Sequence, residues 1–336
     1  MSDHSIISLD AMSGDLGAEA VVRAADASLE RHQNLKLILV GDEQELTRLV
    51  GEIVGEQSRL SIRHASEVVG MSEPPAEALR KKKDSSMRIA INLVKEGEAH
   101  ACVSAGNTGA LMATAKFVLK MLPGIDRPAI IAELPSRGGS LHMLDLGANT
   151  QATADHLFQY AVMGAIVAND ILGIEKPRVA LLNIGAEDTK GNDTVKEAAA
   201  MLGTSTLNYV GFIEGSDLFR GKADVVVTDG FTGNVALKTM EGTVGLCVHY
   251  FRRQFTKNWF AKLQAVMAQW VLRGLRVEMD PRNYNGATLV GLNGIVIKSH
   301  GSADAYAFQH AIETAIVEVR NQLPQQIGAL LEKEAA

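Results

Sequence analysis

The sequence has few cysteines and no long apolar run, and each shortage excludes a class of protein. Only two of the 336 residues are cysteines, Cys102 and Cys247, so a disulfide framework is excluded and a reducing compartment is expected. No stretch approaches the ~20 apolar residues that a membrane-spanning helix needs. Residues 1–14 lack the apolar core of a signal peptide. We therefore expect a cytoplasmic protein without a membrane-spanning segment.

Several cofactor and catalytic motifs are also missing. None of the 31 glycines stands in the G-x-G spacing of a dinucleotide-binding loop, and neither a Walker loop nor H-E-x-x-H nor G-x-S-x-G occurs. The two cysteines are too far apart in sequence to suggest a zinc pair. Cys102 falls inside a predicted strand, where a free thiol is commonly inert, so we disfavour an acyl-enzyme through it. The sequence predicts no metal and no cofactor.

The overall composition is that of a globular protein. Hydrophobic residues make up 46% of the chain and charged residues 21%, enough for a substantial core and too apolar for a disordered chain. The 33 basic residues are outnumbered by 39 acidic ones, for a net charge of −6. This balance argues against a nucleic-acid partner bound by bulk charge.

The charge is unevenly distributed along the chain. No acidic residue lies between Glu241 and Glu278, whereas six basic residues and both tryptophans do. Removing those six positive charges from the net −6 leaves −12 for the remainder of the chain. The segment 245–280 is therefore predicted to be a basic, aromatic helical appendage, a helical hairpin, attached to a single α/β catalytic unit, 1–336.

Short β-branched or leucine-rich runs alternate with helical patterns, which predicts a mostly parallel sheet covered by helices, an αβα sandwich. The expected strands are Ile6–Leu9, Leu35–Val40, Leu60–Arg63, Ala101–Ser104, Ala129–Leu134, Leu141–Asp145, Arg178–Asn183, Leu207–Phe212, Ala223–Thr228 and Val290–Ile297. The expected helices include Ala18–Glu30, Glu77–Glu96, Thr108–Leu122, Ala154–Leu172, Thr194–Leu202 and Ala303–Gln322.

Four expected strands run into loops of small and polar residues that precede helices. Ligands of open α/β sheets bind beyond the carboxyl ends of the strands, and a helix start favours an anion. One such loop is uninformative, because glycine commonly just makes the turn, but four together indicate a phosphate or carboxylate site. The loops follow Val103, Leu144, Asn183 and Thr228.

At these loops the sequence resembles the PlsX phosphate acyltransferases of bacterial phospholipid synthesis. The resemblance covers about residues 6 to 320. It is carried by Asp10-Ala11-Met12-Ser13-Gly14-Asp15, Arg80–Met87, Ser104-Ala105-Gly106-Asn107-Thr108-Gly109-Ala110, Leu144–Asn149, Leu181–Gly185, Asp229-Gly230-Phe231-Thr232-Gly233-Asn234 and Lys298-Ser299-His300-Gly301.

The resemblance implies an enzyme that converts acyl-[acyl-carrier-protein] and inorganic phosphate into acyl phosphate and free carrier protein. It also implies a homodimer with a fold similar to phosphotransacetylases and isocitrate-type dehydrogenases. The product would pass to a membrane glycerol-3-phosphate acyltransferase, so we expect peripheral association with the inner face of the membrane. Such chemistry needs cations and amide donors to bring an anion to a carbonyl, and no metal or nucleotide.

The catalytic candidates on this resemblance are His300, Lys190 and Asn234. Imidazole can pass a proton near neutral pH, although a lone histidine is usually structural. Lys190 would bind phosphate, or is a solvated surface lysine. Asn234 and Asn107 would orient a carbonyl or phosphate, or simply cap helices. The expected substrate-binding residues are Asp10, Asp15, Ser104, Gly106, Asn107, Thr108, Gly109, Asn149, Asp229, Thr232, Gly233 and Lys298.

The basic, aromatic segment has three open interpretations. Phe251, Phe255, Trp259, Leu263, Val266 and Trp270 fall broadly on one helical face. Such a helix suits a membrane surface, a dimer core or the acidic carrier protein. The expected carrier-protein or membrane contacts are Lys82, Lys83, Arg252, Arg253, Lys257, Trp259, Lys262, Trp270, Arg273 and Arg276.

Two rival functions remain. A phosphotransacetylase or phosphotransbutyrylase would use acyl-coenzyme A in place of the carrier protein. A non-catalytic membrane adaptor would hold lipid-synthesis enzymes together, although the intact loop motifs argue against it.

Overall fold

The computed structural model describes residues 4–55, 57–137, 139–278 and 280–335. Its strands form one eleven-stranded sheet in the order β3-β2-β1-β4-β11-β10-β5-β6-β9-β7-β8. The strands are β1 (Ser5–Asp10), β2 (Leu35–Gly41), β3 (Leu60–His64), β4 (Ala101–Ser104), β5 (Ala129–Ser136), β6 (Gly139–Leu144), β7 (Val179–Leu182), β8 (Tyr209–Ile213), β9 (Val225–Val227), β10 (Ala287–Val290) and β11 (Ile295–Lys298).

Seven of the ten strand pairings are parallel, which confirms the predicted mostly parallel sheet. The three antiparallel pairings are consecutive and join β11 to β10, β10 to β5, and β5 to β6. Three reversals leave β6, β9, β7 and β8 running opposite to β3, β2, β1, β4 and β11. The register aligns Leu144, the last residue of β6, through Ile131, Thr288 and Ile297 with Val103 of β4, so the carboxyl ends of the two parallel halves lie at nearly the same level of the sheet.

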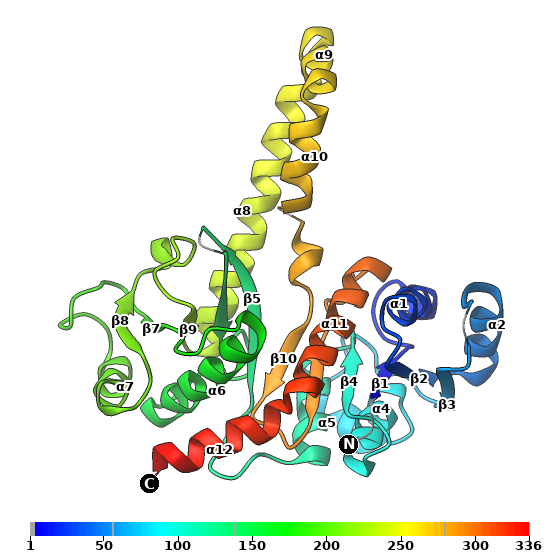
Figure 1. Cartoon of the computed structure of the whole chain (residues 1–336), viewed down its shortest axis with the longest axis horizontal. Helices are drawn as coiled ribbons and strands as arrows, with labels where there is room; N and C mark the ends of the chain where they lie inside the picture. Colours follow the sequence, from blue (N-terminus) through cyan, green and yellow to red (C-terminus); the bar gives the residue numbers. More distant parts are fainter. Residues whose placement is uncertain (1–3, 56, 138, 279, 336) are drawn as a thin grey trace.

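Helices cover both faces of this sheet (Figure 1). The helices are α1 (Gly17–Arg31), α2 (Glu43–Ile53), α3 (Pro75–Lys81), α4 (Ser86–Glu96), α5 (Thr108–Leu119), α6 (Ala154–Leu172), α7 (Asp193–Thr204), α8 (Gly230–Thr256), α9 (Trp259–Met267), α10 (Gln269–Glu278), α11 (Ala305–Asn321) and α12 (Leu323–Ala335).

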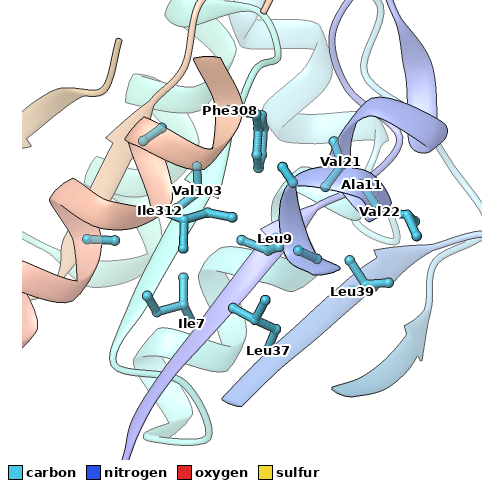
Figure 2. Close-up of a cluster of buried hydrophobic side chains, with 14 of the residues drawn as sticks. Ile7, Leu9, Ala11, Val21, Val22, Leu37, Leu39, Val103, Phe308 and Ile312 are labelled. Atoms are coloured by element: carbon cyan, nitrogen blue, oxygen red, sulfur yellow. The ribbon is translucent and has the colours of Figure 1, made fainter. Parts of the chain in front are cut away.

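The buried side chains form three clusters, divided by the sheet. On one face, β1, β2, β4 and β11 pack against α1, α2 and α11. Figure 2 shows the centre of this cluster, where Leu9 of β1 lies between Phe308 and Ile312 of α11 and Leu37 and Leu39 of β2. A second cluster on this face packs α6, α7 and α12 on the other half of the sheet. The third cluster lies on the opposite face, under α3, α4, α5 and the first turns of α8.

Two predicted elements are wrong, because local contacts interrupt them. The expected strand Val290–Ile297 is two antiparallel strands, β10 and β11, joined by a turn in which Gly291 has a φ of +93°. The expected helix Glu77–Glu96 is divided into α3 and α4. The break comes where Asp84 accepts hydrogen bonds from the backbone and hydroxyl of Ser66, and where the Ser85 hydroxyl accepts from Arg88 N to start α4.

The basic segment forms a projecting helical hairpin. The C-terminal part of α8 leads to α9 at the tip, and α10 returns beside α8 (Figure 1). The predicted single apolar face is wrong, since Lys257 and Asn258 end α8 and the Asn258 side chain accepts from Ala261 N to start α9. Phe251 and Phe255 thus belong to α8, and Trp259 begins the next helix.

Candidate active site

Three of the predicted substrate-binding residues lie side by side on adjacent strands. Asp10 at the end of β1 pairs in register with Ser104 at the end of β4, and Ser104 pairs with Lys298 at the end of β11. Because these strands are parallel, their carboxyl ends meet at one edge and bring together segments almost 300 residues apart in the chain, at positions 10 and 298. Sequence spacing alone gives no measure of this proximity.

The carboxyl group of Asp10 is buried beneath three hydroxyl groups. Its Oδ2 accepts a hydrogen bond of 2.6 Å from Ser104 Oγ. Burial raises the pKa of Asp10, and the hydroxyls of Ser104, Ser86 and Ser13 oppose that rise. The Ser104 hydroxyl also accepts from Gly106 N at 3.1 Å, and Ser13 Oγ accepts from Ala105 N at 3.1 Å. Asp10 therefore stabilises the loop after β4 from below, through the hydroxyls of Ser104 and Ser13.

Lys298 presents an amine with an unusually low pKa. Burial lowers the pKa of Lys298 to about 8, with a further lowering from the charge of Lys238, while Asp10 and Asp15 oppose the change. Its Nζ donates to the carbonyl oxygens of Ala105, at 3.4 Å, and of Ser299. A desolvated ammonium beside a loop of small residues is a strong site for an anion, because little water screens it.

The loop after β4 leads directly into α5. Asn107 caps that helix, since its Oδ1 accepts from Ala110 N at 3.0 Å and its Nδ2 donates to the carbonyls of Met71 and Glu73. The side chain of Asn107 thus has the geometry of a cap. Thr108 and Gly109 form the first turn of α5, where N–H groups have no partner within the helix and can meet an anion.

Close packing explains the glycine at position 106. A Cβ there would lie 2.5 Å from Met87 Cε and 3.2 Å from Ser104 Oγ. Glycine lets the loop rest directly on the first turn of α4.

His300 lies exposed on the loop after β11. Its Nδ1 is 2.8 Å from Ser302 Oγ, and its backbone N donates to Asn285 Oδ1 at 2.8 Å. With Nδ1 engaged, Nε2 is the ring nitrogen that can exchange a proton with a ligand. Asp15 is exposed nearby, with its backbone N donating to Gly301 O at 2.7 Å.

The remaining predicted residues gather at the carboxyl ends of β6, β9 and β7. Buried Asp145 organises this group: Oδ1 accepts from the backbone N–H groups of Ile130, Gly147 and Ala148, and Oδ2 from Asn149 N at 2.7 Å. The Asn149 amide donates to Pro128 O, Asp145 Oδ2 and Tyr160 Oη, so it holds this loop together.

The start of α8 packs tightly on the Asp145 loop. Asp229 caps the helix by accepting from the backbone N and hydroxyl of Thr232 at 2.9 and 2.7 Å. Asn234 Nδ2 donates to Leu146 O at 3.2 Å. A Cβ at Gly233 would lie 1.9 Å from Asp145 O, so only glycine fits there.

Lys190 lies exposed on the loop after β7. The loop is held by Asn183, whose Nδ2 donates to Lys190 O at 3.2 Å and whose Oδ1 accepts from Ile184 N. Asn183 therefore fixes the backbone of Lys190, and the long Lys190 side chain is exposed.

The four loops follow two sets of strands that run in opposite directions, and the register brings the carboxyl ends of both sets to nearly the same level of the sheet. His300 and Lys298 belong to the set of strands that includes β11, whereas Lys190 and Asn234 follow β7 and β9 of the other set. The first turns of α8 run from one group toward the other and carry Lys238, whose charge acts on Lys298. The opposite directions of the two sets arise from the three antiparallel pairings at the centre of the sheet, which no single loop motif signals.

Sequence reasoning missed four residues that shape these two groups: Ser13, Ser86, Asp145 and Lys238. The first three lie inside the motifs that carry the family resemblance, so those motifs could have identified them as site residues. Lys238 lies within a long helix and has no such signal.

The hairpin leaves most of its predicted contact residues in solvent. Trp259 and Trp270 are 77% and 76% exposed, and Phe251, Val266 and Met267 are exposed as well. Arg252, Arg253 and Lys257 are exposed, as is Arg273, Lys262 is exposed on α9, and the side chain of Arg276 lies outside the described residues. Lys82 differs, because its Nζ pairs with Glu73 at 3.0 Å and donates to Val68 O.

Within the described ranges, no group of three or more histidine, cysteine, aspartate or glutamate side chains could hold a metal ion. In the same part of the chain, no helix has the length and apolar character to cross a membrane. The Cys102 thiol is fully buried, and burial raises its pKa, which keeps it protonated.

The chain is similar in sequence to known proteins over nearly its whole length. A family described as "Fatty acid synthesis protein" matches residues 6–326. A phosphate acyltransferase of Alkalilimnicola ehrlichii is 58% identical over 333 residues, covering 99% of this chain and 97% of the relative. A phosphate acyltransferase of Halorhodospira halophila is 55% identical, covering 99% and 98%.

A phosphotransacetylase from Streptococcus pyogenes has a similar fold, with a TM-score of 0.65 and 20% identity over 96% of this chain and 95% of that one. This confirms the predicted likeness of fold to phosphotransacetylases. The resemblance carried by the loop motifs is confirmed by the sequence relatives. The chain belongs to the phosphate acyltransferase family, and it is an acyltransferase of fatty acid and phospholipid synthesis.

Proposed function

We propose that the enzyme transfers an acyl group from acyl-[acyl-carrier-protein] directly to inorganic phosphate. The observation that carries this proposal is the row formed by Asp10, Ser104 and Lys298 at one register position of adjacent strands. It puts a desolvated ammonium against the loop that leads into α5, and an ammonium and a helix start both favour a phosphate dianion.

In this reaction a phosphate oxygen forms a bond to the thioester carbonyl carbon, and the carbonyl oxygen takes the negative charge. The C–S bond then breaks, the carbonyl re-forms and the thiolate leaves. A thiol has a pKa of about 8.5, so the leaving group needs little acid assistance. We assign the ammonium of Lys298 to phosphate binding, and Nε2 of His300 to proton transfer toward the departing thiolate.

Asp10 and Ser104 hold the loop that Lys298 faces, and Asp15 borders it. Thr108, Gly109 and Gly106 supply backbone rather than side-chain groups, and we propose Asn107 as the cap that orients them. We propose that Lys190 and Asn234, on the loops after β7 and β9, act on the same acyl thioester from the second set of strands. Their neighbours in that role are Asn149, Asp229, Thr232 and Gly233.

A thiol-release assay tests the function. Long-chain acyl-carrier protein or acyl-coenzyme A is mixed with phosphate, and free thiol and acyl phosphate are measured. Release with the carrier-protein donor supports the proposal. Release with coenzyme A alone would identify a phosphotransacetylase-type enzyme, and release with neither donor would contradict catalysis.

We further propose that the hairpin attaches the enzyme to a membrane surface as a homodimer, near a membrane glycerol-3-phosphate acyltransferase that takes the product. Exposed tryptophans and basic residues on one projection suit anionic lipid, at about 1 kcal/mol per basic residue. Charge reversal of Arg252, Arg253 and Lys257 tests the idea through vesicle binding. Unchanged binding to anionic vesicles would contradict it.

A further inference from the structure

A second basic surface lies on α4 and α5, away from the hairpin. Its centre is Phe117, whose side chain is 53% exposed. The Arg88 guanidinium lies 5.2 Å from the ring centroid and the Lys120 ammonium 4.9 Å from it. Lys116 is exposed beside them on α5. We call Arg88, Lys116, Phe117 and Lys120 the Phe117 surface.

The positive charge of this surface is not balanced locally. Residues 99–125 contain no acidic residue at all. The acids on either side are occupied elsewhere, since Glu98 pairs with Arg63 and Asp126 lies 3.9 Å from His156. Among the described residues Arg88, Lys116 and Lys120 form no ion pair. By contrast, Lys81 and Lys82 of the neighbouring basic run pair with Glu77 and Glu73.

The backbone holds this arrangement in place. Lys120 ends α5 with a φ of +65°, in the left-handed region that few side-chain-bearing residues adopt. Asn293 N donates to Lys120 O at 3.1 Å, and Lys120 N donates to Lys116 O at 3.2 Å. The ammonium is thus aimed over Phe117 from a fixed helix end.

The surface shares its helix with the proposed phosphate site. α5 begins at Thr108 in that site and reaches Phe117 nine residues later, about 14 Å along the helix axis at 1.5 Å per residue. A partner bound at Phe117 would lie within reach of the start of α5, provided that its reactive group is on a flexible arm.

We propose that the Phe117 surface docks the acidic acyl carrier protein during acyl transfer, an inference that rests on the proposed function. Its unpaired cations complement acidic side chains, and Phe117 offers one apolar anchor flanked by cations, a combination typical of protein contacts. A lipid surface fits less well, because Phe117 is the one exposed large hydrophobic side chain on the described residues of α4 and α5. The hairpin has many exposed apolar side chains, so it suits a lipid surface better than the Phe117 surface does.

The test uses two variants and a matched control. Phe117→Ala removes the anchor, and Lys116→Glu with Lys120→Glu reverses two charges. The control, Lys36→Glu with Lys176→Glu, makes the same charge change at exposed positions elsewhere. Arg88 is left unchanged because it is half-buried. Circular dichroism and thermal unfolding establish that each variant is folded.

Each protein is assayed at low ionic strength with acyl-carrier protein and with acyl-coenzyme A, and binding of the holo-carrier protein is measured by calorimetry. We expect kcat/KM for the carrier donor, and carrier affinity, to fall on the order of tenfold in both variants. Turnover of acyl-coenzyme A should stay at the wild-type value, as should every measurement on the control.

Unchanged carrier binding in both variants would overturn the docking proposal, and so would an equal loss with both donors. Loss of vesicle binding with intact carrier binding would assign the surface to lipid instead. If the wild-type enzyme used coenzyme A alone, the proposed function would fail, and the calorimetric comparison would still decide whether the surface binds the carrier.

Discussion

At the scale of single residues, the low pKa of Lys298 makes a pH dependence the first expectation. With a pKa of about 8, Lys298 loses its proton as the pH rises through 8, whereas phosphate remains a dianion. If the ammonium binds phosphate, kcat/KM for phosphate should fall about tenfold per pH unit above 8. Lys298→Met should lower kcat/KM at pH 7 and abolish that fall. A wild-type profile that stays flat to pH 9.5 would contradict the assignment.

The low pKa of Lys298 also makes the free energy of unfolding depend on pH. The unfolded chain keeps a lysine protonated to about pH 10.4, so between pH 8 and 10.4 it binds more protons than the folded chain. The Lys298 contribution to the free energy of unfolding therefore rises with pH across this window. Below pH 8 the folded protein bears the full cost of the buried charge. Urea denaturation at pH 7.5 and 9.5 measures the free energy of unfolding of the wild type and of Lys298→Met. The difference between the two proteins should be smaller at pH 9.5 than at pH 7.5.

Cys102 and His300 are predicted to behave in opposite ways. The buried, protonated thiol of Cys102 cannot act as a nucleophile, so Cys102→Ala should retain turnover within about twofold. His300→Ala should lower kcat by about 10²-fold, as loss of a proton-transfer group does, without unfolding. Initial rates of thiol release measure both. Full activity in His300→Ala would remove it from the mechanism.

At the scale of elements, the contact between α8 and the Asp145 loop depends on a missing side chain. Gly233→Ala would put a Cβ 1.9 Å from Asp145 O, so α8 would have to shift and the free energy of unfolding should fall by roughly 2–3 kcal/mol. Gly242→Ala is the matched control on the same helix, because nothing lies within 4 Å of its Cβ. It should raise stability by about 0.5–1 kcal/mol. Equal effects of the two substitutions in urea titrations would refute this account.

At the scale of the whole molecule, the hairpin and the body should respond independently to substitution. No residue of α9 is buried, and the hairpin contributes nothing to the three core clusters of the described chain. Trp259→Ser with Trp270→Ser should leave the melting temperature of the body within about 2 °C while weakening vesicle binding or self-association. Calorimetry and sedimentation provide the two readouts. A large drop in melting temperature would instead show that the hairpin stabilises the body.

The elements with a clear local pattern could be predicted from sequence. β4 and α6 have the predicted bounds, because buried apolar runs and caps such as Thr153 act over a few residues. The prediction of one strand over Val290–Ile297 was wrong because the apolar residues on both sides of residues 291–294 hide the reversal of direction there. The prediction of a single apolar face in the hairpin was wrong because Asn258 starts a new helix. A helical periodicity calculated across the whole segment does not detect such a break.

The sequence by itself determined the family, the alternation of strands and helices, and which loops bear polar groups, since all three depend on residues near one another in the chain. Only the tertiary structure decided which loops meet. The parallel order β1-β4-β11 aligns Asp10, Ser104 and Lys298, and the register through three antiparallel pairings brings the strand ends that precede Lys190 and Asn234 to nearly the same level of the sheet. It alone also placed Arg88 and Lys120 on Phe117. Strand order and helix packing are set by long-range burial, which no local pattern records.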